Sequence, residues 1–268
     1  MTAISNVGPA WYFEQLSDDE FSPTSYVGGA WNPAEQHIAP VLGLLTHLIE
    51  QDCANRGRDN LLISRLSFEI LGPLRMAPFR VSVAVIRPGK TIELVEARIT
   101  AAERTAVVLR AWLLVGGDTA AISGSPIIAM PDPDTLPKWE YSSVWRGEFV
   151  RTVQARRAEQ SPGRCTIWVR TDIDLLKNTS VSSTARFMGL IDVANGATPR
   201  ASPDAVAFPN LDLTAHLIRA PIGSWVGLDT TVSFGSTGVG LTHSLIHDER
   251  GPVGVVSQCL TVRPAGNT

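Results

Sequence analysis

Asp192 has surroundings that could make its carboxylate a base toward water. It follows the apolar run Phe-Met-Gly-Leu-Ile and precedes Val-Ala, near the C-terminal end of a predicted helix. Burial and the negative end of the helix dipole would both raise its pKa. A carboxylate with a raised pKa is better matched to taking a proton from water. The alternatives are a solvated aspartate in the last helical turn, or one that bonds a nearby asparagine.

Two amide side chains could orient such a carboxylate or a water molecule. Gln258 lies in the strand-like run GVVSQCLTV, on the same face as three apolar residues. A buried amide there needs partners, because an unsatisfied one costs about 1–3 kcal/mol; exposure at a sheet edge is the alternative. Asn210 opens the run NLDLTAHLI, where asparagine often only forms a turn. The residues that share its face are more typical of a solvated sheet surface: Asp212, Thr214 and His216.

Three other sequence patterns were considered, and none indicates a metal, phosphate or esterase site. His243 and His247 would lie about 13 Å apart along a strand, too far apart to bind one metal ion. GSTGVG (235–240) joins two strands and does not open a helix, so it predicts a hairpin and not a phosphate site. The chain lacks a Gly-x-Ser-x-Gly elbow. We therefore expect no metal and no cofactor.

Composition narrows the class of protein. Of 268 residues, 44% are hydrophobic and 18% are charged, so the chain can bury a core. A net charge of −3 gives no reason to expect a nucleic-acid partner. The N-terminal segment does not resemble a secretory signal, and no apolar run is long enough to cross a membrane. The three cysteines, far apart in sequence, predict small apolar thiols in a cytoplasmic protein: Cys53, Cys165 and Cys259.

The pattern of elements occurs twice. Residues 35–52 predict a helix that is apolar on nearly all sides, and four β-rich runs follow at 61–70, 79–86, 91–99 and 106–115. After a segment rich in proline and glycine comes a predicted hairpin over 147–175. A second apolar helix, SSTARFMGLIDVANG (182–196), is then followed by four more strands at 210–218, 225–234, 239–247 and 253–262.

Three landmarks give the offset between the copies. Pro73 and Pro221 differ by 148, Phe79 and Trp225 by 146, and Val115 and Val262 by 147. We therefore predict a duplicated α+β fold with domains at 1–115 and 146–268 joined by a linker at 116–145. A helix apolar all round needs a sheet to cover it, so each half is predicted to be a hotdog, and the whole chain a double hotdog.

With these motifs the sequence resembles the type II (TesB-like) acyl-CoA thioesterases. The likeness is carried in order by WYFEQL…FSPTSYVGGAW, FMGLIDVANG, NLDLTAHLIRAPIGSW and GVVSQCLTVRP. It implies that an aspartate, a serine or threonine and a glutamine hold a water, at the positions of Asp192, Asn210 and Gln258. The middle residue departs from that pattern, because asparagine has no hydroxyl. The resemblance implies hydrolysis of acyl-CoA to fatty acid and CoA in fatty acid metabolism.

The glycine pair in YVGGAW suggests a substrate contact. Gly28 and Gly29 could let the backbone approach a thioester, with N–H groups that stabilise an oxyanion; a plain turn is the alternative. His37 lies just before the apolar helix. Its side chain could point into the groove, or His37 could simply be a residue at the start of the helix. At an offset of 146, Asp192 corresponds to Thr46, and at 147 Gln258 corresponds to Ala111. We therefore expect one hydrolytic site per chain.

Two rival functions stay open at this stage. A hotdog hydratase or dehydratase would pair a histidine with an aspartate, and no histidine lies near Asp192 in sequence register. An acyl-CoA or lipid binding protein without catalysis is compatible with Asn210. Exposed sheet edges allow a homo-oligomer, but the sequence does not distinguish monomer, dimer and tetramer.

Overall fold

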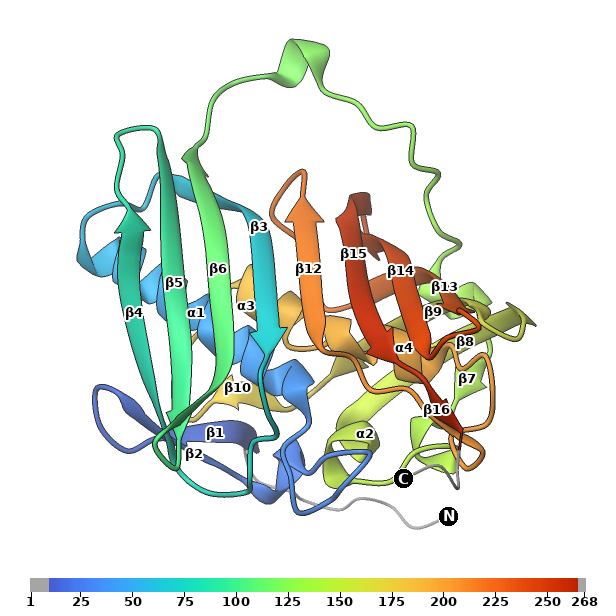
Figure 1. Cartoon of the computed structure of the whole chain (residues 1–268). Helices are drawn as coiled ribbons and strands as arrows, with labels where there is room; N and C mark the ends of the chain where they lie inside the picture. Colours follow the sequence, from blue (N-terminus) through green and yellow to red (C-terminus); the bar gives the residue numbers. More distant parts are fainter. Residues whose placement is uncertain (1–9, 265–268) are drawn as a thin grey trace.

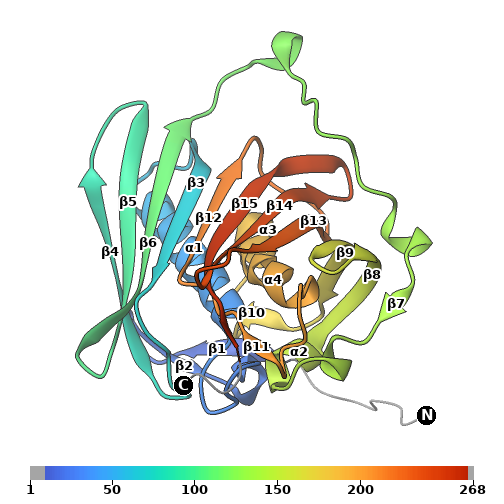
Figure 2. The same cartoon turned by 45° about the vertical axis from the view of Figure 1, so that its right-hand side comes forward.

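Strands from both halves of the chain join in one sheet. The computed structural model describes residues 10–264; the ends of the two predicted domains, 1–9 and 265–268, lie outside the described residues, as does the start of the segment examined for a secretory signal. The sheet has 14 strands in the order β10-β1-β2-β4-β5-β6-β3-β12-β15-β14-β13-β9-β8-β7. Figure 1 and Figure 2 show that it curves around the helices. The fold is the predicted double hotdog.

The elements of the first half and the linker lie close to the predicted ranges. The first half contains β1 (Trp11–Gln15), β2 (Glu20–Pro23), η1 (Ser25–Val27), α1 (Ile38–Asn55), β3 (Leu61–Ile70), β4 (Phe79–Arg87), β5 (Ile92–Ala101) and β6 (Arg104–Val115). The segment that follows has no α-helix before residue 148 and contains η2 (Ala120–Ile122), η3 (Pro133–Thr135), β7 (Lys138–Trp139) and η4 (Tyr141–Ser143).

The second half repeats the plan with shorter helices. It begins with α2 (Glu148–Thr152), β8 (Val153–Ser161), β9 (Arg164–Thr171) and β10 (Asp174–Leu176). The helical layer consists of α3 (Ser183–Met188), η5 (Ile191–Val193) and α4 (Ala194–Ala197). The remaining strands are β11 (Val206–Ala207), β12 (Asp212–Leu217), β13 (Val226–Phe234), β14 (Val239–Asp248), β15 (Gly251–Thr261) and β16 (Arg263–Pro264).

The two halves meet at equivalent strands. β3 and β12 are antiparallel, and Ser67 is the register partner of Thr214. Their hydroxyl oxygens are 3.0 Å apart. Since 214 − 67 = 147, the strands pair about equivalent positions, in agreement with the offset found in the sequence.

Helix α1 is buried along most of its length, as predicted, but it begins three residues later. Gln36 and Glu35 form extended bridges with Gly28 and Arg75, so neither is free to start a helix. The Nδ1 atom of His37 accepts a hydrogen bond from the N–H of Ala39 at 3.1 Å and caps the helix instead. Capping by a side chain satisfies one of the amides that a helix start leaves without a partner.

The predicted second helix is broken, which corrects both its extent and one argument about Asp192. A Cβ atom on Gly43 of α1 would lie 2.7 Å from the carbonyl oxygen of Ala185 and 2.9 Å from the Cα of Gly189. The backbones of α1 and α3 therefore touch, and α3 ends just before Gly189. Asp192 lies in η5, ahead of α4. It is not at a helix C-terminus, so the predicted dipole effect is wrong.

The linker leaves β6, arches away from the sheet and descends beside the second half to β7 (Figure 1). Its last part is fixed to the segment that carries Asp192. The hydroxyl of Tyr141 donates to the carbonyl oxygen of Val193 at 3.2 Å, and the indole Nε1 of Trp145 donates to that of Gly196 at 2.7 Å. The linker thus positions the helical segment of the second half.

Other sequence expectations have mixed outcomes. Cys53 and Cys165 are buried free thiols, but Cys259 is exposed and its expected apolar role is wrong, because its side of β15 faces outward. Within residues 10–264, no helix combines the length and the hydrophobicity needed to cross a membrane. The same residues contain no group of three or more His, Cys, Asp or Glu side chains arranged to hold a metal ion.

Candidate active site

The three residues singled out in the sequence meet in space. Asp192 comes from η5, Asn210 from the segment just before β12, and Gln258 from β15. The Nδ2 atom of Asn210 and the Nε2 atom of Gln258 each donate to Oδ1 of Asp192, both at 2.8 Å. One carboxylate oxygen is therefore fixed by two amide donors.

Burial controls the chemistry of Asp192. Its side chain is only 4% exposed. Burial raises the pKa of Asp192 from 3.8 to about 7, although the hydrogen bonds from Asn210 and Gln258 lower it in part. Removal of water from around a carboxylate disfavours the charged form, while donors aimed at it favour that form. At neutral pH the group is thus close to the point where it gains or loses a proton.

Asp192 and Asn210 border a cavity of about 140 Å³. Within the described residues, Oδ2 of Asp192 accepts no hydrogen bond, in contrast to Oδ1. Oε1 of Gln258 is buried and also lacks a partner in that part of the chain. These two oxygens are acceptors that a water molecule beside Asp192 could satisfy.

His37 lines the same cavity as Asp192. Its Nδ1 accepts from the Ala39 amide, so the proton of the neutral ring is on Nε2. Burial lowers the pKa of His37 to about 3, which keeps the ring neutral. Its ring packs against Phe149 with centroids 4.2 Å apart. The structure thus shows that His37 caps the helix and is one of the residues that border the cavity.

The glycine pair is held in a turn. The N–H of Gly28 donates to the carbonyl oxygen of Ser25 at 3.1 Å, and that of Gly29 to Glu35 at 2.8 Å. Neither amide is free to bind an oxyanion, which favours the turn interpretation. Gly29 still borders the cavity. A side chain at Gly147, where φ is +94°, would collide with the carbonyl of Gly29.

An aromatic wall completes the cavity, and the sequence reasoning missed it. Trp31 and Trp145 line the cavity, with ring centroids 4.7 Å apart and planes at 77°. Trp31 also packs edge-on against Phe208, at 5.4 Å. Trp31 is 45% exposed, so it forms the outer rim. The only signal in the sequence is the concentration of aromatic residues in loops, which does not reveal that they meet.

The remaining polar residues of the β12 face do not reach the cavity. Oδ1 of Asp212 accepts from the amide of Cys259 at 2.6 Å. Thr214 bonds Ser67, and His216 is exposed. Of these four residues, only Asn210 forms a hydrogen bond with Asp192.

Comparison with known protein families identifies the family of the chain. The acyl-CoA thioesterase N-terminal domain family matches residues 27–114, and the C-terminal domain family matches residues 126–262. The second match alone covers more than half of the 268 residues. The chain belongs to the acyl-CoA thioesterase family, whose members are thioester hydrolases, and the resemblance seen in the sequence is confirmed. No curated protein matches the sequence.

Solved structures share the fold at low sequence identity. A putative thioesterase from Novosphingobium aromaticivorans is 15% identical with a TM-score of 0.71, covering 94% of this chain and 98% of that one. A protein with a hot dog fold from Alicyclobacillus acidocaldarius is 10% identical, with a TM-score of 0.72 and coverages of 93% and 95%. An acyl-CoA thioesterase II from Mycobacterium marinum is 16% identical with a TM-score of 0.66, and the match covers 96% of this chain and 97% of that one. At these levels of sequence identity, the three similarities show a shared fold.

Proposed function

We propose that the chain hydrolyses acyl-CoA thioesters to free fatty acid and CoA, with Asp192 as the general base. One observation carries the proposal: a buried carboxylate has one oxygen fixed by two amides and the other free beside a cavity. Asp192 takes a proton from water as the water oxygen attacks the thioester carbonyl carbon. The carbon–sulfur bond then breaks, and the proton passes to the departing thiolate.

Asn210 and Gln258 supply acceptors for the attacking water. Nδ2 of Asn210 already donates to Asp192 and to the carbonyl oxygen of Asp212, at 3.2 Å. Both its hydrogens are used, which leaves only Oδ1 for water. A water that donates one hydrogen to Asp192 and the other to one of these oxygens directs a lone pair at the carbonyl carbon. This supports asparagine in place of the hydroxyl residue of the family pattern.

His37 is proposed to contact the substrate. Its neutral ring carries a proton on Nε2 and borders the cavity. Such a donor would bind the thioester oxygen as negative charge develops there. The Gly28 and Gly29 segment supports the wall of the substrate site by its shape, because its amides are already bonded.

A hydratase or dehydratase is the second candidate, and His37 is the observation that favours it. A histidine does border the same cavity as the aspartate, contrary to the sequence register. Its low pKa counts against it as a proton donor at neutral pH, since the imidazolium is disfavoured. The proposal therefore remains hydrolysis.

The test is thiol release from acyl-CoAs of short to long chain length, with wild type and Asp192→Ala. A general base contributes about 10²- to 10⁴-fold, so the variant should lose at least a hundredfold in kcat. A fully active variant would refute the mechanism. If no substrate releases thiol while acyl-CoA still raises the melting temperature, the chain is a binding protein without catalysis.

Three broader expectations belong to the same proposal. The free cysteines support a cytoplasmic location, because reduced thiols are typical there. The product class supports a place in fatty acid metabolism. We also retain the domain limits of 1–115 and 146–268 around the linker. Cell fractionation tests the location, and expression of the two halves separately tests the limits.

A further inference from the structure

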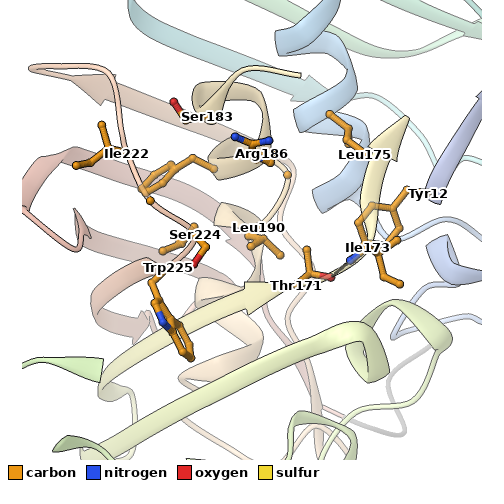
Figure 3. A pocket seen from close by; sticks show the side chains of 14 residues that line it. Tyr12, Thr171, Ile173, Leu175, Ser183, Arg186, Leu190, Ile222, Ser224 and Trp225 are labelled. Carbon is orange, nitrogen blue, oxygen red and sulfur yellow. Dashed lines mark hydrogen bonds between the residues drawn. The ribbon is translucent and has the colours of Figure 1, made fainter. Parts of the chain in front are cut away.

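A second cavity, of about 280 Å³, lies apart from Asp192. It opens between α3, the connection from β9 to β10, and the segment that leads into β13 (Figure 3). It shares no lining residue with the cavity at Asp192. The proposed hydrolytic mechanism does not use it.

The inner wall of this cavity is apolar. Its buried side chains include Leu175, Phe187, Leu190 and Val226. Tyr12 contributes its ring, while its hydroxyl is 2.6 Å and 3.1 Å from the hydroxyls of Thr152 and Thr171. The polar atom of the wall is therefore satisfied within the protein. A ligand that enters must present hydrocarbon to this wall, since an unpaired polar group there would lose its hydrogen bonds to water.

Arg186 is the one charged side chain among the residues that line the cavity. Arg186, in the last turn of α3, is exposed, and it takes part in no ion pair within residues 10–264. No acidic side chain is among the lining residues. Two carboxylates beside the lining residues are already bonded: Glu249 accepts from the amide of Ser224 at 2.9 Å, and Glu50 accepts from the hydroxyl of Ser182 at 2.6 Å. Ser183 and Ser224 add hydroxyls to the rim (Figure 3).

We propose that this cavity binds a fatty acid, with Arg186 holding the carboxylate and the apolar wall holding the chain. A guanidinium matches a carboxylate with two parallel hydrogen bonds. One arginine with two serine hydroxyls suits a single small anion, and the apolar interior excludes a polar body behind it. A fatty acid is also the class of product that the proposed hydrolysis releases, but the binding does not depend on that reaction.

The size of the cavity sets the preferred chain length. A methylene group takes up about as much space as a water molecule, about 30 Å³. A cavity of about 280 Å³ therefore has room for roughly nine such groups. Each methylene that enters should tighten binding about fourfold, so affinity should rise steeply from hexanoate to decanoate and level off for longer acids.

The test is calorimetric titration of the full chain with hexanoate, octanoate, decanoate, dodecanoate and the neutral 1-decanol. Decanoate should bind wild type more tightly than 1-decanol. Arg186→Gln should weaken decanoate about tenfold, the scale of one charge-assisted hydrogen bond, without affecting 1-decanol. Arg186→Lys should recover part of the loss. Arg104→Gln, at an exposed arginine of β6, is the matched control and should leave both affinities unchanged.

A second variant tests the location of the chain. Ser183→Trp places an indole in the mouth of the cavity at a half-buried position, and it should abolish binding of both ligands while the melting temperature stays within a few degrees. Absence of decanoate binding to wild type overturns the proposal. So does equal binding by wild type and Arg186→Gln. Decanoate carries no thioester, so failure here is separate from failure of thiol release.

Discussion

Replacing Asp192 by asparagine should stabilise the protein, and the gain should grow with pH. In the folded state the pKa of Asp192 is about 7, against 3.8 for the ordinary carboxyl. Between these pH values the folded protein keeps a proton that the unfolded chain has released. The free energy of unfolding of wild type therefore falls as pH rises from about 4 to about 7, and stays low above that.

The size of the effect follows from the pKa. Each pH unit over this range is worth about 1.36 kcal/mol, so wild type should lose about 2.7 kcal/mol between pH 5 and its pKa near 7. Asparagine has no proton to lose, and its carbonyl oxygen can still accept from Asn210 and Gln258. The variant should therefore gain about 2.7 kcal/mol over wild type between pH 5 and pH 8, or roughly 5–10 °C in melting temperature.

Thermal and urea unfolding at pH 5, 6, 7 and 8, followed by circular dichroism, would measure this difference. Asp59→Asn is the matched control, because it makes the same change of side chain at a residue that is exposed in the turn before β3. If the two stability profiles of Asp192→Asn and wild type run parallel within about 0.5 kcal/mol, the carboxyl is not perturbed and its proposed role loses its physical basis.

Three further outcomes follow from the same contacts. The kcat/KM for thioester hydrolysis should rise with pH through a midpoint near 7, as the base loses its proton, and a flat profile from pH 6 to 8 would contradict this. Gln258→Leu removes a donor to Asp192, so this midpoint should move to higher pH and kcat/KM at pH 7 should fall about tenfold; an unmoved midpoint would count against the assigned contact. Gly43→Ala forces a methyl group against α3 and should cost about 1–3 kcal/mol in unfolding free energy, whereas Gly72→Ala, where a Cβ meets nothing within 4 Å, should cost far less.

Strand positions and the partners of Asp192 were predictable, because local patterns determine them. The run from Leu61 to Ile70 is bounded by turn residues, and the strand has those limits. Gln258 lies on an apolar face, so it had to find a partner inside, and that partner is Asp192. Asn210 could be added only through the family pattern, because an asparagine at the start of a strand most often forms a turn.

The features that the sequence did not predict depend on tertiary contacts. A glycine can end a helix or be tolerated within one, so Gly189 alone does not fix the end of α3; the break coincides with the contact with Gly43 in another helix. The cavity rim depends on Trp31 and Trp145, which are 114 residues apart in the sequence (145 − 31). The amides of Gly28 and Gly29 are bonded because the turn closes on the carbonyl oxygens of Ser25 and Glu35. Contacts between residues that are distant in sequence can be identified only once the three-dimensional structure is known.

Fusion of the two hotdogs has an evolutionary consequence. In a homodimer, every substitution appears in both subunits, so a change that improves one copy of a site alters the other copy as well. Here the position equivalent to Asp192 is Thr46, which is buried and bonds the carbonyl of Leu42 at 2.7 Å, and the position equivalent to Gln258 is the buried Ala111. A single chain lets one repeat accumulate packing residues while the other keeps polar chemistry. Two hotdogs in one chain can therefore be selected for different tasks.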